Sequence, residues 1–256
     1  MSPRFNLKIR DHIHLPEKKR YYNERHFTEA ASRYDLATRA MSLGRDVTWK
    51  RALVDALPDI PRPLCVDIAC GTGDLAFLLA EKYPRGEIVG LDLTGPMLAL
   101  ARGRNRFRNV RFTRQDMNSL GFASESVDVV TGGYALRNAP SLGLALDETC
   151  RILKPDGVAA FLDFSKPANR FLQVPEYWLL KSWCGFWGFV LHGNPEIHAY
   201  IASSLKVFPD RMQLRGLFVH KGFELRLSRA FFLGIMELDV LRKVPGSKHL
   251  PPAAAP

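Results

Sequence analysis

The sequence predicts an α/β fold in which helices cover both faces of a doubly wound, mostly parallel sheet. Short apolar segments with the character of buried strands alternate with helix-period segments, and this alternation is typical of parallel sheets. The chain has 256 residues, of which 46% are hydrophobic, so it can bury a substantial core as one α/β domain. The predicted strands are Leu64–Cys70, Glu87–Leu93, Val110–Gln115, Val127–Gly132 and Val158–Phe164.

Turn residues mark where helices begin and end. Pro96 fits the first turn of a helix that follows the second strand. The triplet Pro155-Asp156-Gly157 predicts a turn that ends the helix carrying Glu148 and Arg151. We therefore expect a helix on each side of the central strands.

Two regions fall outside this alternating core. Residues 1–52 are expected to form a helical N-terminal cover, and an insertion at about 166–208 interrupts a core that runs from 53 to 243. We expect both to act as a lid over a substrate, because ligands of such sheets lie beyond the carboxyl ends of the strands. The tail 244–256, which ends in Pro-Pro-Ala-Ala-Ala-Pro, is expected to be disordered.

The most informative segment runs from Val66 to Ala76, where an apolar strand leads through a glycine turn into a helix. Gly71, Gly73 and Ala76 satisfy the loose fingerprint G-x-G-x-x-G/A of nucleotide-like cofactors. Asp67 lies near the end of the strand, where its charge would repel a diphosphate and attract an ammonium or sulfonium group. Two unit charges about 4 Å apart interact by roughly 4 kcal/mol at an effective dielectric constant near 20. The loop therefore favours a cationic cofactor.

Two more acids close the next two strands. Asp92 stands about 20 residues after the glycine loop, where an acid typically accepts both hydroxyls of a ribose. Asp116 ends the third strand, where it could receive an adenine amino group. The alternative interpretation is that strand-end aspartates only form turns and caps. Three acids at three successive strand ends favour the cofactor site.

These residues resemble the motifs of class I S-adenosylmethionine-dependent methyltransferases. Further segments resemble a narrower group, the UbiE-like ubiquinone/menaquinone C-methyltransferases, and the resemblance extends from about Phe27 to Lys243. The Leu-Arg-Asn and Ser-x-x-x-Phe-Pro segments are the most specific to that group. The matching segments are 27–35, 41–51, Ala135-Leu136-Arg137-Asn138, 151–157, 162–167 and 203–209.

The resemblance implies a Rossmann-like, seven-stranded sheet and S-adenosyl-L-methionine as the cofactor. The substrate that it implies is lipophilic, a prenylated benzoquinol or naphthoquinol methylated at a ring carbon. Two alternatives stay open: methylation of another lipophilic acceptor, such as a phospholipid headgroup or an aromatic natural product, and a non-catalytic assembly factor that binds the cofactor. The expected cofactor-binding residues are Asp67, Ala69, Gly71, Thr72, Gly73, Asp92, Leu93, Met97, Asp116, Met117 and Gly133.

The resemblance also places Arg137 and Asn138 beside the end of the fourth strand, and Tyr34 in the N-terminal cover. We interpret Arg137 as the partner of the developing ring oxyanion or the holder of a catalytic water, with Asn138 and Tyr34 orienting the ring. The alternative role for Arg137 is a structural ion pair with Asp163 or Glu148. No strong base is evident.

Four histidines, His12, His14, His192 and His198, lie in the expected covering regions, and a histidine could take a phenolic proton near neutral pH. We prefer His198, because Tyr200 and Ser204 follow it on one possible helical face. Each of the four could instead be an ordinary surface or core histidine. A bound water is an equally good candidate base.

The cysteines indicate a reducing compartment and no metal. Cys65, Cys70, Cys150 and Cys184 show neither a C-x-x-C pair nor metal-ligand spacing. The N-terminus lacks a charged-then-apolar leader with a cleavage site. We therefore expect a cytoplasmic protein without a metal site.

A formal net charge of +10 raises nucleic acid, an anionic membrane or an acidic substrate as partners. The densest basic run, between Arg102 and Arg114, lacks the aromatic residues of a nucleic-acid stacking platform, so we expect no nucleic acid and a solvated or membrane-facing surface. The apolar segment 177–191 contains Trp178, Trp183 and Trp187 and is too short to span a bilayer. It suits an interfacial anchor, a substrate channel or a core-packing helix. Peripheral contact with the inner face of the membrane and a homodimer are the remaining partner expectations.

Overall fold

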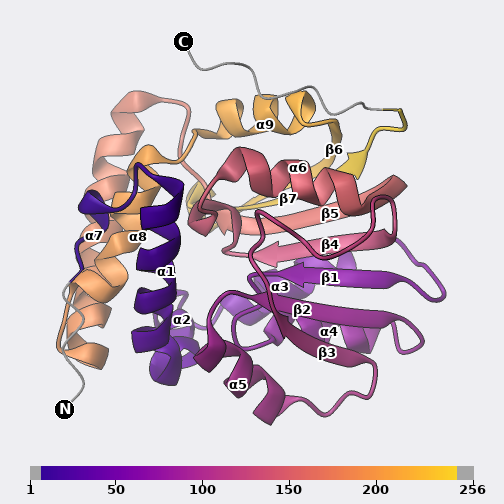
Figure 1. Cartoon of the computed structure of the whole chain (residues 1–256). Coiled ribbons are helices and arrows are strands. Elements are labelled where there is room, and N and C mark those ends of the chain that lie inside the picture. Colours follow the sequence, from indigo (N-terminus) through magenta and orange to yellow (C-terminus); the bar gives the residue numbers. More distant parts are fainter. Residues whose placement is uncertain (1–6, 247–256) are drawn as a thin grey trace.

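The computed structural model describes residues 7–246, and its centre is a seven-stranded sheet with the order β3-β2-β1-β4-β5-β7-β6 (Figure 1). The first five strands are parallel, and β7 pairs with β5 and β6 antiparallel. The α/β prediction is therefore confirmed, including the seven strands. The strands are β1 (Leu64–Ile68), β2 (Glu87–Asp92), β3 (Val110–Arg114), β4 (Val127–Gly133), β5 (Leu153–Phe164), β6 (Phe223–Phe231) and β7 (Met236–Lys243).

The predicted turn at Pro155-Asp156-Gly157 was wrong. Strand β5 begins at Leu153, so these residues lie inside it, at a shift of register against β4 between Val127 and Val129. Asp156 adopts a left-handed φ of 63°, which lets the chain bulge without ending the strand. The helix before it ends at Ile152.

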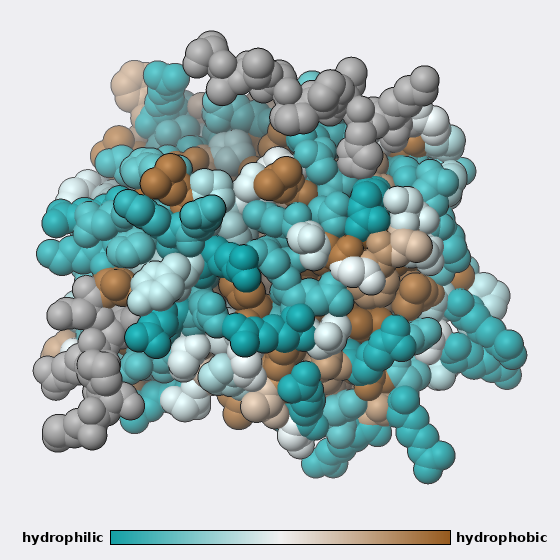
Figure 2. All heavy atoms as spheres, viewed as in Figure 1, coloured by the Kyte–Doolittle hydropathy of each residue, from teal (hydrophilic) through white to brown (hydrophobic). Residues whose placement is uncertain are grey.

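Helices cover both faces of the sheet. One hydrophobic cluster joins α3 (Asp46–Asp55), α4 (Asp74–Lys82) and α5 (Gly95–Arg104) to the sheet, and a second joins α6 (Leu142–Ile152) and α9 (Arg211–His220) to the opposite face. In Figure 1, α6 lies in front of the sheet, α9 lies above it near β6, and α3 and α4 lie behind it. Figure 2 shows the same side of the molecule, where the surface is mostly hydrophilic and hydrophobic side chains appear in small groups. As predicted, Pro96 lies in the first turn of α5.

Four helices gather at the carboxyl ends of the parallel strands, where α1, α7 and α8 stand side by side in Figure 1. They are α1 (Pro16–Ala30), α2 (Tyr34–Met41), α7 (Arg170–His192) and α8 (Glu196–Val207). Helices α7 and α8 form a tight hairpin, because a Cβ on Gly188 would lie 2.8 Å from the carbonyl oxygen of Pro195. The described part of the chain also contains four short 3-10 turns: η1 (Ile9–Asp11), η2 (Ala31–Arg33), η3 (Leu136–Asn138) and η4 (Phe232–Gly234).

Helix α3 runs across the expected boundary at residue 52. It packs on α4, β5 and β7, and its Trp49 is buried in the core cluster of that face. The helix therefore belongs to a layer of the core, while α1 and α2 form the cover. Most of the tail expected to be disordered, residues 247–256, lies outside the described residues.

Candidate active site

The loop after β1 turns sharply through left-handed backbone. Ala69, Gly71 and Gly73 have φ values of 50°, 55° and 93°. A Cβ on Gly73 would lie 2.9 Å from ring atoms of both Phe77 and Phe112, so a side chain is excluded there. Gly73 therefore shapes the turn and starts α4, whereas Gly71 and Ala69 line the cavity described next.

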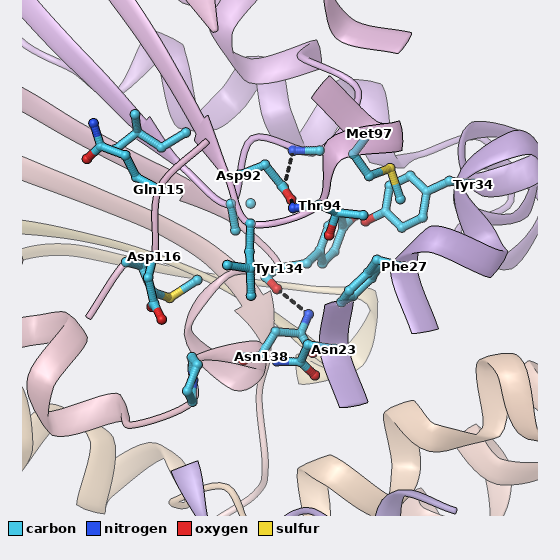
Figure 3. A pocket seen from close by; sticks show the side chains of 17 residues that line it. Asn23, Phe27, Tyr34, Asp92, Thr94, Met97, Gln115, Asp116, Tyr134 and Asn138 are labelled. Carbon is cyan, nitrogen blue, oxygen red and sulfur yellow. Dashed lines mark hydrogen bonds between the residues drawn. The ribbon is translucent and has the colours of Figure 1, made fainter. Parts of the chain in front are cut away.

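A cavity of about 670 Å³ lies beyond the carboxyl ends of β1, β2, β3 and β4 (Figure 3). Its lining mixes acids, backbone and apolar side chains, as a nucleoside requires. Thr94 and Gln115 line it as well, and sequence reasoning missed both. Eight predicted cofactor residues line it: Ala69, Gly71, Asp92, Leu93, Met97, Asp116, Met117 and Gly133.

Asp92 is held rigidly in this cavity. Its two carboxylate oxygens accept backbone N–H groups, Oδ2 from Gly71 at 2.9 Å and Oδ1 from Thr94 at 2.7 Å (Figure 3). Burial raises the pKa of Asp92, and these two hydrogen bonds oppose the rise because they favour the carboxylate. Each oxygen keeps a lone pair, so the fixed carboxylate can still accept ribose hydroxyls.

Asp116 forms the turn contact that the sequence allowed and also lines the cavity. Its Oδ1 accepts the backbone N–H of Asn118 at 2.9 Å, which shapes the turn after β3. Its Oδ2 lies 3.3 Å from Nε of Arg20 on α1. Because Asp116 also lines the cavity, it ties the cover helix to the edge of the cofactor site.

Asp67 and Thr72 line a smaller recess on the far side of Gly71. Asp67 is 1% exposed, and its Oδ1 accepts a hydrogen bond of 2.8 Å from the hydroxyl of Thr131. Its Oδ2 is buried and accepts no hydrogen bond from the described residues. Burial raises the pKa of Asp67 to about 7. An orphaned, buried carboxylate oxygen next to a glycine loop fits the ammonium group of an amino acid moiety.

Two residues that line this recess, Thr72 and Lys50, have contacts that the sequence did not predict. The hydroxyl of Thr72 donates to Asp35 at 2.6 Å, so it ties the loop to α2. Lys50 lines the same recess and was missed from the sequence, although it lies in a matching segment. Its Nζ lies 2.7 Å from Asp74 and 3.4 Å from Asp46. The recess therefore offers both a free carboxylate oxygen and a cation.

A second, apolar cavity of about 770 Å³ adjoins the first. Phe27, Tyr34, Tyr134 and Asn138 line both cavities and form the boundary between them. The rest of the lining comes mainly from α1, α2, α7, α8 and η4 and is largely aromatic and aliphatic. A lipophilic ligand in this cavity would therefore lie next to the cofactor site.

Arg137 is 2% exposed and reaches the apolar cavity. Its guanidinium donates to the hydroxyl of Ser204 and lies over the rings of Phe164 and Tyr200, with its central carbon 5.3 Å and 5.2 Å from their centroids. Its backbone N–H donates to Asp163 Oδ2 at 3.0 Å, and its Nε lies 3.7 Å from Asp163 Oδ1.

The structural ion pair proposed with Asp163 is therefore present. The alternative partner, Glu148, instead pairs with Arg151 at 2.7 Å. Nε of Arg137 is buried and donates no hydrogen bond within the described residues, which leaves a donor for a ligand.

Asn138 and Tyr34 flank the junction of the two cavities (Figure 3). The side-chain amide of Asn138 donates to the backbone carbonyl of Tyr134 at 2.8 Å, and the backbone carbonyl of Asn138 accepts a hydrogen bond of 2.6 Å from the side-chain amide of Asn23. Tyr134 has a left-handed φ of 59°, so its ring enters the junction from a strained turn. Burial raises the pKa of Tyr34, which keeps its phenol protonated.

Two buried histidines line the apolar cavity. His198 is 3% exposed on α8, and burial lowers its pKa to about 4. His26, on α1, is 1% exposed, and burial also lowers its pKa. Sequence reasoning missed His26, because nothing in the chain order places it beside α8.

Three of the six arginines of the basic run, Arg104, Arg111 and Arg114, pair with acids. Arg104 binds Asp35 and Asp74, and Arg114 binds Glu24 on α1, so these charges tie the cover to the core. Within residues 7–246, no cluster of His, Cys, Asp and Glu could hold a metal ion.

The tryptophans of α7 divide between two environments. Trp183 lines the apolar cavity and donates to the carbonyl of Met41 at 3.0 Å. The indole nitrogen of Trp187 is buried, and Trp178 is 57% exposed.

Comparisons with known proteins agree with this geometry. The profile of the ubiE/COQ5 methyltransferase family matches residues 16–240. A demethylmenaquinone methyltransferase of Thermus thermophilus is 36% identical, over 84% of this chain and 98% of the relative. A 2-phytyl-1,4-naphtoquinone methyltransferase of Thermosynechococcus vestitus is 33% identical, over 85% of this chain and 97% of the relative. In structure, a putative methyltransferase of Haloferax volcanii, solved with its Trm112 activator, superposes with a TM-score of 0.63 at 16% identity, over 85% of this chain and 97% of that one.

Proposed function

The chain belongs to the ubiE/COQ5 methyltransferase family, and from this premise we propose that it methylates a ring carbon of a prenylated quinol. The methyl donor of the family is S-adenosylmethionine. The observation that carries the proposal is the apolar cavity, which shares four lining residues with the nucleoside cavity and contains one buried guanidinium. The names of the two relatives favour a naphthoquinol over a benzoquinol.

The residues present fit the cofactor. Asp92 would accept the ribose hydroxyls, Asp116 and Gln115 would face the adenine, and Asp67 would bind the amino group through its free Oδ2. Gly71 lets the backbone approach the ligand closely. When bound, S-adenosylmethionine supplies an electrophilic methyl group on a sulfonium.

Arg137 would stabilise the ring oxygen as its hydroxyl ionises. A deprotonated hydroxyl pushes electron density onto the adjacent ring carbon, which makes that carbon nucleophilic. A fixed donor at a developing oxyanion contributes about 3–4 kcal/mol, and orientation of the reactants contributes some 7–11 kcal/mol. Ser204, Phe164 and Tyr200 hold the guanidinium in place, and Tyr34 and Asn138 would orient the ring.

The activity is tested with S-adenosylmethionine and a panel of chemically reduced demethylated benzoquinols and naphthoquinols, supplied in detergent or lipid. Mass spectrometry should find a product heavier by one methylene unit, largest for the naphthoquinols. Binding of the cofactor without any methylated quinol would refute the proposal and direct the search to other lipophilic acceptors.

We further propose that the exposed face of α7 lies on an anionic membrane. Its outward side chains follow one helical stripe, and Phe171, Val174 and Phe189 are 89%, 61% and 64% exposed. Lys181 lies beside this face, with its Nζ 5.3 Å from the centroid of the Trp178 ring. Apolar side chains flanked by lysine are typical of interfacial helices. Within residues 7–246, no helix is both long and apolar enough to cross a bilayer.

Vesicle flotation tests the membrane contact. Burying a Phe side chain contributes about 1.5–3 kcal/mol, so Phe171→Ser/Phe189→Ser should weaken binding to anionic vesicles at least tenfold. The matched control, Leu100→Ser/Leu144→Ser, removes two exposed apolar side chains from α5 and α6 and should bind like the parent. Equal flotation of all three proteins would refute the contact, and a doubled mass in light scattering that the Phe variant abolishes would assign the face to a second copy of the chain.

A further inference from the structure

The proposed reaction releases a proton inside the apolar cavity. Replacing a ring C–H by C–CH₃ with a cationic donor liberates one H⁺, which must reach solvent. Among the described lining residues, Arg137 is permanently protonated. Burial raises the pKa of Cys184 to about 12 and the pKa values of Tyr34 and Tyr134 still further, so these groups keep their protons. Neutral imidazoles are therefore the acceptors that the cavity offers.

Two imidazoles line the cavity that the guanidinium of Arg137 reaches. The ring of His26 is centred 4.1 Å from the ring of Tyr200, and the guanidinium carbon of Arg137 lies 5.2 Å from that same ring. His198 stands two residues before Tyr200 on α8, and its Nε2 is buried with no hydrogen-bond partner in the described chain. An orphaned nitrogen that lines a cavity can accept a proton from a ligand there.

A third histidine leads from this cluster toward solvent. His192 lies at the end of α7, half-buried, with its ring centre 5.1 Å from that of His198. The C-terminus of a helix favours a protonated histidine. Burial and the charge of Arg33 oppose this effect and lower the pKa of His192, so it would hold the proton only in transit and release it readily to solvent.

We propose that His26 and His198 form the proton acceptor for the quinol hydroxyl and that His192 passes the proton to solvent. This proposal rests on the proposed function. The hydroxyl proton moves to an imidazole nitrogen, the ring carbon bonds to the methyl carbon as the C–S bond breaks with its electron pair left on sulfur, and the ring C–H proton then leaves while the oxygen takes a proton back, which restores the aromatic hydroxyl. One proton leaves in total. The titratable groups around the relay are Tyr22, Tyr34, Tyr200, Arg137, Cys184, Lys19, Asp163 and Glu196, with Arg33 and Glu29 beside His192.

The first test does not need turnover. Protein labelled with ¹⁵N-histidine is saturated with S-adenosylhomocysteine and titrated with 4-nitro-1-naphthol, an acidic phenol of suitable shape. Ring nitrogen shifts, assigned with His26→Gln and His198→Gln, should show neutral imidazoles before the phenol binds and an imidazolium at one of the two afterwards. If both rings stay neutral while the phenolate is bound, the relay is refuted whatever the substrate panel yields.

The second test uses turnover on the quinol that the panel identifies. General base catalysis contributes about 10²–10⁴-fold, so we expect His198→Ala to lower kcat by about 100-fold. Added imidazole should then raise the kcat of this variant by at least about tenfold. Cofactor affinity should stay within twofold. His220→Ala, on the exposed last turn of α9, is the matched control and should behave like the parent. Full activity of both His198→Ala and His26→Gln would overturn the relay and leave the proposed function intact.

Discussion

Replacing Asp67 by Asn should weaken cofactor binding and stabilise the cofactor-free protein. Burial raises the pKa of Asp67 from 3.8 to about 7, so the folded state holds a proton that the unfolded state has lost. One pKa unit corresponds to about 1.36 kcal/mol, which limits the destabilisation by the ionised carboxylate to about 4 kcal/mol. The Asn amide also lacks an acceptor there, so we expect a net gain of about 1–2 kcal/mol, or roughly 2–8 °C in melting temperature.

The stability that Asp67→Asn gains over the parent should depend on pH. The destabilisation by Asp67 is absent below pH 4, grows as the pH rises from 3.8 to about 7, and is complete above pH 7. The melting temperature of the variant should therefore exceed that of the parent at pH 8. At pH 5 this difference in melting temperature should be less than half of its value at pH 8. Differential scanning calorimetry without cofactor measures this directly. The control, Asp59→Asn, removes the same charge from a fully exposed position.

Asp67→Asn should weaken cofactor binding although it stabilises the cofactor-free protein. A charge-assisted hydrogen bond contributes about 1.5–3 kcal/mol, so calorimetric titration should show about 10- to 150-fold weaker binding by Asp67→Asn at pH 8. In the parent, affinity should rise as the pH increases through about 7, because the ammonium group binds the ionised carboxylate. Unchanged affinity would refute the assigned role, and a lower melting temperature at pH 8 would refute the electrostatic reasoning.

Three further outcomes are expected. Asp92→Ala should weaken cofactor binding by tens of times or more in a titration, because it removes the acceptor for the ribose hydroxyls; unchanged affinity would contradict this. Ser204→Ala should lower kcat about tenfold in the quinol assay with cofactor affinity unchanged, since Arg137 loses its hydroxyl partner, and an unaltered kcat would show that the contact is dispensable. Gly73→Ala should cost about 1–3 kcal/mol in denaturant unfolding, because its φ of 93° and the ring of Phe112 exclude a methyl group; equal stability would mean that the turn adjusts freely.

The part of the site proposed to hold the cofactor could be predicted from the sequence because it is local. Asp67, Gly71, Asp92 and Asp116 each lie at or just after the end of a strand, and parallel strands bring their carboxyl ends to one edge. Strand prediction by itself therefore places these residues together at that edge. The same locality accounts for the accurate bounds of β1, β2 and β3.

The substrate half could only be placed by tertiary packing. His26, on α1, and His198, on α8, are brought together by helices whose sequences show no sign of their mutual position. Likewise, the segment 177–191 predicted tryptophans at an interface or in a channel, and only the packing of α7 on α2 and α8 turned Trp183 inward and left Trp178 outside.

What the sequence alone determined is therefore the fold class, the candidate cofactor site and the family resemblance, because these depend on short-range patterns of strand, turn and helix. Tertiary structure decided which hydrogen-bond donors face the apolar cavity. It left Nε of Arg137 and Nε2 of His198 without hydrogen-bond partners among the described residues, and it paired Arg104 and Arg114 of the basic run with the acids Asp35, Asp74 and Glu24. The physical reason is that burial and hydrogen-bond partners depend on residues far apart in the chain, and no local pattern encodes those contacts.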